Sequence, residues 1–288
     1  MKIGLVGDEA FDLPEEIIEK YKIGVVKFKI DLQELKDLPG NIYQKTREAE
    51  KRGIKSVVKT SQPSINDFLS VFKEKLNEFE EIFCVTISSK LSGTHNSAIQ
   101  AKKFLQKEFQ DKVHIIDSLN GSAGEGLVAL KIIELIKRNF NSQEINNKIK
   151  ESIEKTKLLG VYHSPKWLEA SGRFPRFVPA MMQRAEKMSI KPIFGMKNGK
   201  LSIAGVKRNI TDLSSALFEE FDKATRKTRE KGEKIIVGIT HADDINQANK
   251  LKEMILSLKN TEVAFINLTC FPIGGHIGPN SLVLSWQE

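Results

Sequence analysis

The sequence has few of the residues that hold small secreted proteins or metal centres together. Its 288 residues include two cysteines, Cys84 and Cys270, each within an apolar run and far from the other. This spacing excludes a Cys-x-x-Cys redox pair and a cysteine-rich metal site. We therefore expect two buried thiols in a reducing cytoplasm, and neither a metal nor a cofactor.

A segment suited to crossing a bilayer is also missing. Residues 263–287 carry no formal charge, but two prolines and several glycines interrupt them. In lipid, a backbone broken in this way could not satisfy its hydrogen bonds. Near the N-terminus, Asp8 and Glu9 interrupt the apolar run before it reaches the length of a signal-peptide core. The sequence predicts a cytoplasmic protein without a transmembrane segment.

Signatures of nucleotide and nucleic-acid binding are absent as well. There is no GxxxxGK[ST] loop and no GxGxxG after the first predicted strand. Two tryptophans and three tyrosines offer few rings for base stacking. Residues 165–232 hold 15 Lys+Arg and 7 Asp+Glu, which leaves 30 of each sign elsewhere. This local excess of basic charge suits a solvated surface or a docking face for an acidic partner. We expect no nucleic-acid partner.

What the sequence does contain is an alternation of short β-rich runs with longer helical patterns. This alternation is typical of βαβ units and a mainly parallel sheet. The predicted elements of the first half include strands at residues 2–6, 22–30, 82–87 and 113–116 and a helix at 95–109. The second half reads as mixed strands with packed helices. The predicted fold class is α/β, with one domain at residues 1–157 and a second α/β domain at 158–288.

Three segments combine small hydroxyl residues with glycine at predicted strand-to-helix junctions, namely residues 60–64, 88–95 and 117–124. Loops at the carboxyl ends of parallel strands line the ligand crevice of such sheets. Helix N-termini and hydroxyl groups there would suit a compact anion, and a single carboxylate suits them better than a triphosphate. Ordinary helix capping accounts for Ser64 and, in our interpretation, for Ser118.

One histidine stands in an unusual setting near the C-terminus. His276 lies within residues 274–280, which also include three glycines and a proline. Such a composition favours a tight loop with positive φ angles, and we expect it to present the imidazole at a loop tip.

Taken in order, these motifs resemble the DegV family across essentially the whole chain. The residues that carry the resemblance are Asp8 with Asp12-Leu13-Pro14, Thr60-Ser61-Gln62-Pro63-Ser64, Ser88-Ser89-Lys90-Leu91-Ser92-Gly93-Thr94, Asp117-Ser118, Gly172-Arg173, Ile190-Lys191-Pro192, Lys207-Arg208 and His276-Ile277-Gly278-Pro279.

The resemblance implies an N-terminal α/β/α domain with a mainly parallel sheet, joined to a C-terminal α/β sandwich with a mixed sheet. It further implies one long-chain fatty acid in a tunnel between the domains, presented to a fatty acid kinase that makes acyl phosphate for phospholipid synthesis. The implied carboxylate-binding residues are Thr60, Ser61, Ser92, Gly93 and His276. The residues that the resemblance and the local basic charge suggest for kinase docking are Arg208, Lys207 and Arg173.

Two other functions remain open from the residues. One is a carrier of another amphiphilic carboxylate or acyl lipid. The second is a hydrolase with Ser92 as nucleophile, His276 as base and Asp117 as orienting acid, although Ser92 lacks the GxSxG context of a nucleophile elbow. Because the fatty-acid carrier is our preferred interpretation, we expect no catalytic residue.

Overall fold

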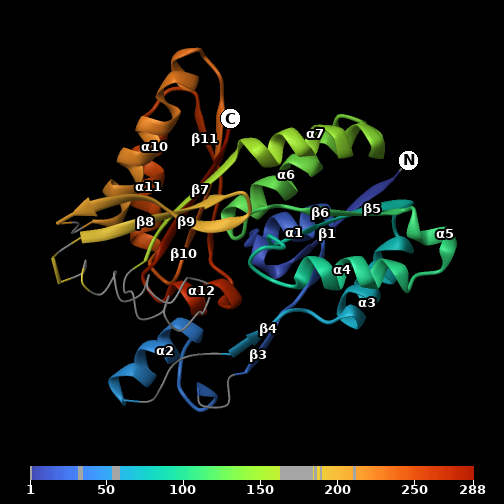
Figure 1. Ribbon diagram of the computed structural model, residues 1–288, viewed down its shortest axis with the longest axis horizontal. Coiled ribbons are helices and arrows are strands. Elements are labelled where there is room, and N and C mark those ends of the chain that lie inside the picture. The colour runs from blue at the N-terminus through green and yellow to red at the C-terminus, as the bar shows by residue number, and fades with distance from the viewer. Residues whose placement is uncertain are drawn as a thin grey trace.

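The structure is a computed structural model that describes residues 2–31, 35–53, 59–162, 184, 187–188, 190–209 and 212–288 (Figure 1). Its described strands form a four-stranded sheet, a two-stranded sheet and a six-stranded sheet, called here sheets A, B and C. Helices cover sheets A and C, so the predicted α/β class is confirmed. The division into two domains at residue 157/158 stays a prediction.

Sheet A is wholly parallel, in the order β2-β1-β5-β6. Its strands are β1 (Ile3–Asp8), β2 (Gly24–Val26), β5 (Glu81–Thr86) and β6 (Val113–Asp117). Every residue of β1 is buried, as expected of a parallel strand with helices on both faces. The sequence-predicted strands at 2–6, 82–87 and 113–116 are therefore confirmed.

Two helical layers enclose sheet A. One face packs against α3 (Ile65–Leu76) and α4 (Thr94–Lys103), and the other against α6 (Ala123–Lys137) and α7 (Ser142–Lys155). The remaining helices of this half are η1 (Glu9–Phe11), α1 (Glu15–Tyr21), α2 (Ile42–Lys51) and α5 (Lys107–Gln110). Ser64 forms a capping box with Asp67 at the start of α3, which confirms its predicted capping role.

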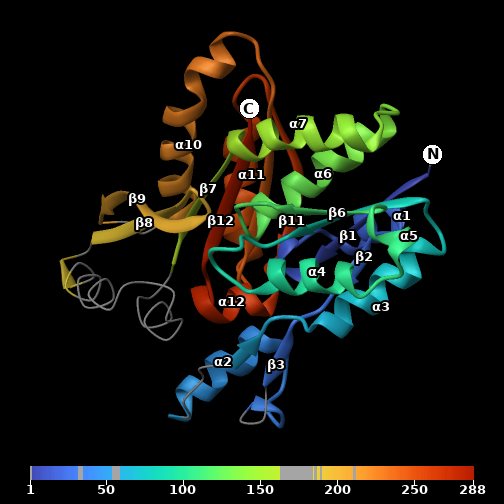
Figure 2. The same cartoon turned by 45° about the vertical axis from the view of Figure 1, so that its right-hand side comes forward.

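Sheet C is mixed, in the order β11-β10-β12-β7-β8-β9, and among its described strand pairs only β10–β11 is parallel. Its strands are β7 (Thr156–Val161), β8 (Ile190–Lys197), β9 (Lys200–Arg208), β10 (Ile235–His241), β11 (Thr261–Leu268) and β12 (Leu282–Gln287). One face packs against α10 (Leu213–Glu230) and α11 (Ile245–Leu256) (Figure 2). The short helix α12 (Phe271–Ile277) stands between β11 and β12 in the chain.

Two predicted elements differ from the structure. The strand predicted at residues 22–30 is two strands: β2 in sheet A, and β3 (Lys29–Asp31), which pairs antiparallel with β4 (Lys59–Ser61) in sheet B. Between them, the amide of Phe28 donates to Glu9 Oε1, and the chain leaves sheet A. The helix predicted at 95–109 ends at Lys103, because the amides of Phe104 and Leu105 bond carbonyls three residues back in a tightened turn.

Two expectations about apolar segments can also be compared with the structure. Among the described residues, no helix is both long enough and apolar enough to cross a membrane. Cys84 is buried in the core between sheet A and helices α3 and α4, as expected. Cys270 is only partly buried, so the expectation of a buried thiol is wrong for this residue.

Helix α6 lies between sheets A and C. Its first seven residues are buried, and its side chains share one core with Phe83 of β5 and Phe265 of β11. The helix approaches both neighbours closely at Gly126: a Cβ there would lie 2.5 Å from the carbonyl oxygen of Phe11 and 2.9 Å from Cζ of Phe265. Its lack of a side chain lets the two layers meet across the helix.

We expect Gly126→Ala to lower the free energy of unfolding by about 1–3 kcal/mol, although alanine is the better helix former by about 1 kcal/mol. The reason is that a Cβ at this position overlaps a backbone oxygen, which cannot rotate away. Urea denaturation would measure the effect. Gly205→Ala in β9 is the matched control: its Cβ would come no nearer than 4.0 Å to the neighbouring Glu220, so its effect should be within about 0.5 kcal/mol. Wild-type stability of Gly126→Ala would contradict this account.

Candidate functional site

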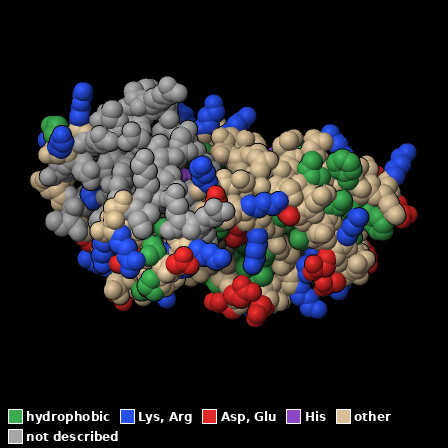
Figure 3. Space-filling view, turned by 90° about the horizontal axis from the view of Figure 1, so that it is seen from below, with side chains coloured by type: hydrophobic (Ala, Val, Ile, Leu, Met, Phe, Trp, Pro, Cys, Tyr) green, Lys and Arg blue, Asp and Glu red, His purple; other side chains and the backbone are tan. Residues whose placement is uncertain are grey.

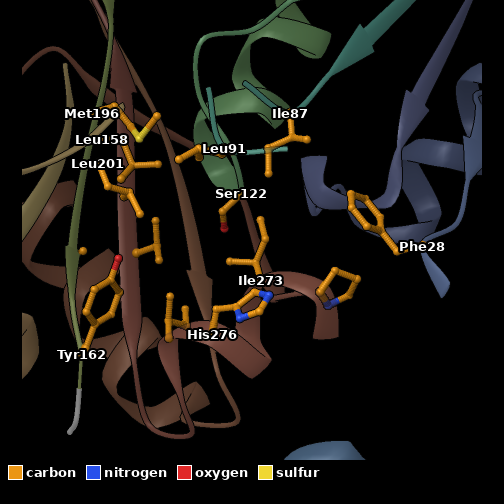
Figure 4. Close-up of a pocket in the computed structure, with 15 residues that line it drawn as sticks. Phe28, Ile87, Leu91, Ser122, Leu158, Tyr162, Met196, Leu201, Ile273 and His276 are labelled. Atoms are coloured by element: carbon orange, nitrogen blue, oxygen red, sulfur yellow. The ribbon is translucent and has the colours of Figure 1, made fainter. Parts of the chain in front are cut away.

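A largely apolar pocket lies between the two large sheets (Figure 4). It opens where Phe28, Ile87 and Ser122 follow the carboxyl ends of β2, β5 and β6, the usual ligand side of a parallel sheet. About 670 Å³ of space not filled by atoms lies within it, part of it open to solvent. The apolar side chains of the opposite wall are Leu158, Met196, Leu201, Ile273, Ile277 and Val283. Such a pocket suits an apolar ligand.

The wall on the side of sheet C follows from the two-residue period of a β-strand. Leu158 and Tyr162 face the pocket, whereas Leu159 and Val161 pack against the α10 and α11 side. Between them, Gly160 lines the pocket without a side chain. The sequence analysis did not predict these wall residues. The alternation in residues 158–162 was the available signal, but it does not say which face α6 leaves uncovered.

His276 is the main polar residue at one end of the pocket, and its setting differs from the expectation. It lies in the last turn of helix α12 instead of at a loop tip. Gly274 serves close packing, since a Cβ there would lie 1.8 Å from the hydroxyl of Tyr43, and among the glycines of this segment only Gly278 has a positive φ, of 82°. The predicted loop is therefore wrong, while His276 does line the pocket.

Thr60 is brought to His276 by strand β4. The Oγ1 of Thr60 and Nε2 of His276 lie 3.1 Å apart and share a hydrogen bond. Two residues further on, Gln62 donates to Ser97 Oγ of α4 at 3.0 Å, and its side chain packs against Gly93. The segment from Thr60 to Gln62 thus lies between α12 and the N-terminus of α4, and it connects three of the predicted site segments.

The other predicted carboxylate-binding residues, Ser61, Ser92 and Gly93, are not among the residues that line the pocket. Ser92 Oγ hydrogen-bonds Thr94 Oγ1 at 2.8 Å, and Ser61 is exposed on β4, opposite Lys29. Asp117, the orienting acid of the hydrolase alternative, accepts hydrogen bonds from the amides of Ser89 and Leu119. The three members of that triad therefore bond three different groups, and these contacts do not support a relay.

Beside the pocket, a buried hydrogen-bond network joins the two large sheets. Ser122 Oγ, on the pocket wall, donates to Asp12 Oδ2 at 2.6 Å and also lies 2.6 Å from Thr240 Oγ1 of β10. Asp12 Oδ1 accepts from the amide of Cys270 at 2.7 Å, just before α12. The network therefore fixes α12, and with it His276, relative to the end of β1.

Burial raises the pKa of the acids in this region. Burial raises the pKa of Asp8 to about 7, although the amides of Ile87 and Ala10 donate to its carboxylate. Burial likewise raises the pKa of Asp12 to about 7 against the hydrogen bonds from Ser122 and Cys270. For Glu125, burial and the nearby acids raise the carboxyl pKa well above its usual value. Like charges in a desolvated site favour protonation.

The residues predicted for partner docking lie on or near strand β9. Lys207 bonds Glu219 and Glu220 of α10 at 2.6 and 2.9 Å, whereas Arg208 is exposed. Arg173 lies outside the described residues. On the face shown in Figure 3, basic side chains are interspersed with acidic ones over the described surface. Of the predicted docking residues that are described, Arg208 is the one that presents its charge to solvent.

Comparison with known proteins agrees with this architecture. A family model described as "Uncharacterised protein, DegV family" matches residues 2–288, so the chain belongs to the DegV family. It is 27% identical to a fatty acid-binding protein of Thermotoga maritima, over 98% of this chain and 96% of that one. It resembles a fatty-acid-binding DegV family protein of Thermus thermophilus with a TM-score of 0.84 and 25% identity, with 100% of both chains covered. A DegV family protein of Eubacterium eligens, loaded with heptadecanoic acid, shares the fold at 23% identity, with 99% of both chains covered and a TM-score of 0.80.

We expect the buried carboxyls to make stability fall as pH rises. A carboxyl with a pKa of about 7 in the folded state and 3.8 in the unfolded chain keeps a proton that the unfolded chain has lost, so the free energy of unfolding decreases between about pH 4 and 7. Asp12→Asn removes one such group. Its amide can still accept from Cys270 and donate to Ser122. Between pH 5 and pH 8, the free energy of unfolding of this variant should decrease by roughly 1–3 kcal/mol less than that of the wild type.

Urea denaturation at both pH values measures this difference. Asp111→Asn, at an exposed carboxyl after α5, is the control and should keep the wild-type decline. An Asp12→Asn decline as steep as that of the wild type would mean that Asp12 is ionised in the folded protein.

Proposed function

We propose that this chain binds one long-chain fatty acid without catalysing its conversion, with the carboxylate near Thr60 and His276 and the acyl chain in the pocket. The observation that carries the proposal is the pocket itself: its lining is largely apolar, with His276 at one end, and Thr60 is hydrogen-bonded to that histidine. The membership of the chain in the DegV family supports it, since DegV relatives of this fold bind fatty acids. Ser61, Ser92 and Gly93 complete the proposed carboxylate-binding set.

The acyl chain should supply most of the affinity. Burying about sixteen carbons at roughly 0.8 kcal/mol per methylene yields on the order of 12 kcal/mol before the costs of association. Hydrogen bonds to a charged group contribute about 1.5–3 kcal/mol each, and loss of hydration offsets part of this. The polar residues therefore position the carboxylate, whereas the apolar wall holds the molecule.

We further propose that the bound acid is presented in the cytoplasm to a fatty acid kinase, which makes acyl phosphate for phospholipid synthesis. The exposed position of Arg208 supports a role in docking an acidic kinase surface. Lys207 contributes less to such a surface, because its ammonium is already paired with Glu219 and Glu220. Arg173 completes the proposed docking set.

Fatty-acid binding and ester hydrolysis, measured in parallel, test the carrier proposal. Native mass spectrometry of the purified protein should show about one fatty acid per chain. With delipidated protein, His276→Gln should bind fatty acid at most about tenfold more weakly than the wild type, because glutamine can still donate a hydrogen bond and the acyl chain supplies most of the affinity. Neither protein should hydrolyse short-chain esters.

The control is His114→Gln on β6, where the histidine bonds Glu81 outside the pocket; it should bind like the wild type. Absence of fatty-acid binding by the wild type would overturn the proposal. Saturable ester turnover that is lost in His276→Gln would favour the hydrolase instead.

Charge reversal tests the docking proposal. Arg208→Glu should slow acyl-phosphate formation several-fold at low salt and leave fatty-acid affinity unchanged, since Arg208 does not line the pocket. The difference should narrow as salt screens the charges. Lys252→Glu on α11 makes the same change in net charge at another exposed site. If Arg208→Glu and Lys252→Glu support the same rate as the wild type, Arg208 does not dock the kinase.

A further inference from the structure

The apolar wall of the pocket contains one hydroxyl that the proposed function does not use. Tyr162 is only 8% exposed, lines the pocket, and stacks on Phe194 with ring centroids 4.6 Å apart. Within the described part of the chain, its hydroxyl has no hydrogen-bond partner. In Figure 4 the oxygen points from the ring into the group of apolar side chains that includes Leu158 and Leu201.

The position of this hydroxyl follows from the strand. Leu158, Gly160 and Tyr162 share the pocket side of the β7 segment by the two-residue period, and stacking on Phe194 of β8 fixes the ring. Because Gly160 has no side chain, it leaves space beside the Tyr162 ring, where its Cβ would lie 3.6 Å from Cε1. The oxygen is therefore held by a rigid element and is accessible from the pocket.

When a purely apolar ligand fills the pocket, a hydroxyl in this wall loses its hydrogen bonds to water without replacement, which is unfavourable. Burial also raises the pKa of Tyr162 well above its usual value, so the phenol keeps its proton and remains a donor. The side chains that share its cluster are apolar: Leu158, Phe194, Met196, Ile273, Ile277 and Val283. Since a well-held buried water needs two to four polar partners, this wall favours an oxygen atom carried by the ligand.

We propose that the pocket selects fatty acids with an oxygen atom part-way along the acyl chain, as a hydroxyl or oxo group, and that the Tyr162 hydroxyl donates a hydrogen bond to it. This inference rests on the proposed fatty-acid binding and specifies its substrate class. A plain alkyl chain fills the same space but leaves the phenol unpaired. A site built to pair a substrate oxygen discriminates against the analogue that lacks it.

The experiment compares octadecanoic acid with hydroxyoctadecanoic acids that carry the hydroxyl at successive mid-chain carbons. Their affinities are measured by competition on delipidated wild type and Tyr162→Phe. At one favoured position, the wild type should bind the hydroxy acid about 3- to 10-fold more tightly than octadecanoic acid, which is the usual net effect of one hydrogen bond. Tyr162→Phe should lose that preference and bind octadecanoic acid at least as tightly as the wild type.

Tyr21→Phe is the matched control, because it removes a phenol hydroxyl from a residue outside the pocket and should keep the wild-type preference. Equal affinity of the wild type for all acids in the series would overturn the inference and leave the proposed function intact. A preference that survives in Tyr162→Phe would also overturn it, since another group would then bind the oxygen. If the wild type binds none of these acids, both proposals fail.

Discussion

The buried contact between Asp12, Ser122 and Thr240 is the constraint on which the rest of the site depends. Asp12 lies shortly after β1 of sheet A, and Ser122 immediately precedes α6. Thr240 lies on β10 of sheet C, so this one network spans both large sheets. The same carboxyl accepts from the amide of Cys270 at the start of α12. Burial favours the protonated form of Asp12 and raises its pKa to about 7, whereas the hydrogen bonds from Ser122 and Cys270 favour the carboxylate.

Helix α6 determines how much of sheet C remains available to a ligand. Its contact at Gly126 is close enough that no side chain fits between Phe11 and Phe265, and α6 covers parts of β10, β12 and β7 of sheet C. Beyond it, Leu158, Tyr162 and Val283 form a separate apolar cluster that faces the pocket. The pocket is thus the part of the intersheet space that the helix does not fill.

The sequence predicts the α/β class well because strand and helix periods are local properties, and β1, β5 and β6 follow the strand period directly. Prediction from the sequence fails where contacts between residues far apart in the chain determine the local structure. Residues 22–30 have one uninterrupted β pattern, yet Gly24–Val26 pairs with β1 while Lys29–Asp31 pairs with β4. Around His276, glycine suggested a loop, but Gly274 is needed for contact with Tyr43 in a helix. The pocket-facing position of Tyr162 could not be predicted either, since no local pattern shows which strand face the helices leave open.

Different contacts hold the two ends of the pocket in place. The orientation of a ligand and its affinity would therefore depend on different parts of the structure. Sheet C supplies the apolar wall through continuous strand pairing. The polar end depends on a hydrogen bond between Thr60 and His276, 216 residues apart, and on contacts from α2: Tyr43 donates to the carbonyl of Thr269 at 2.5 Å, and Arg47 pairs with Asp243 and Asn280. Loosening α2 would therefore move α12 and His276 while leaving the apolar wall in place. If the chain binds a fatty acid as proposed, the carboxylate would lose its fixed position before the ligand lost most of its affinity.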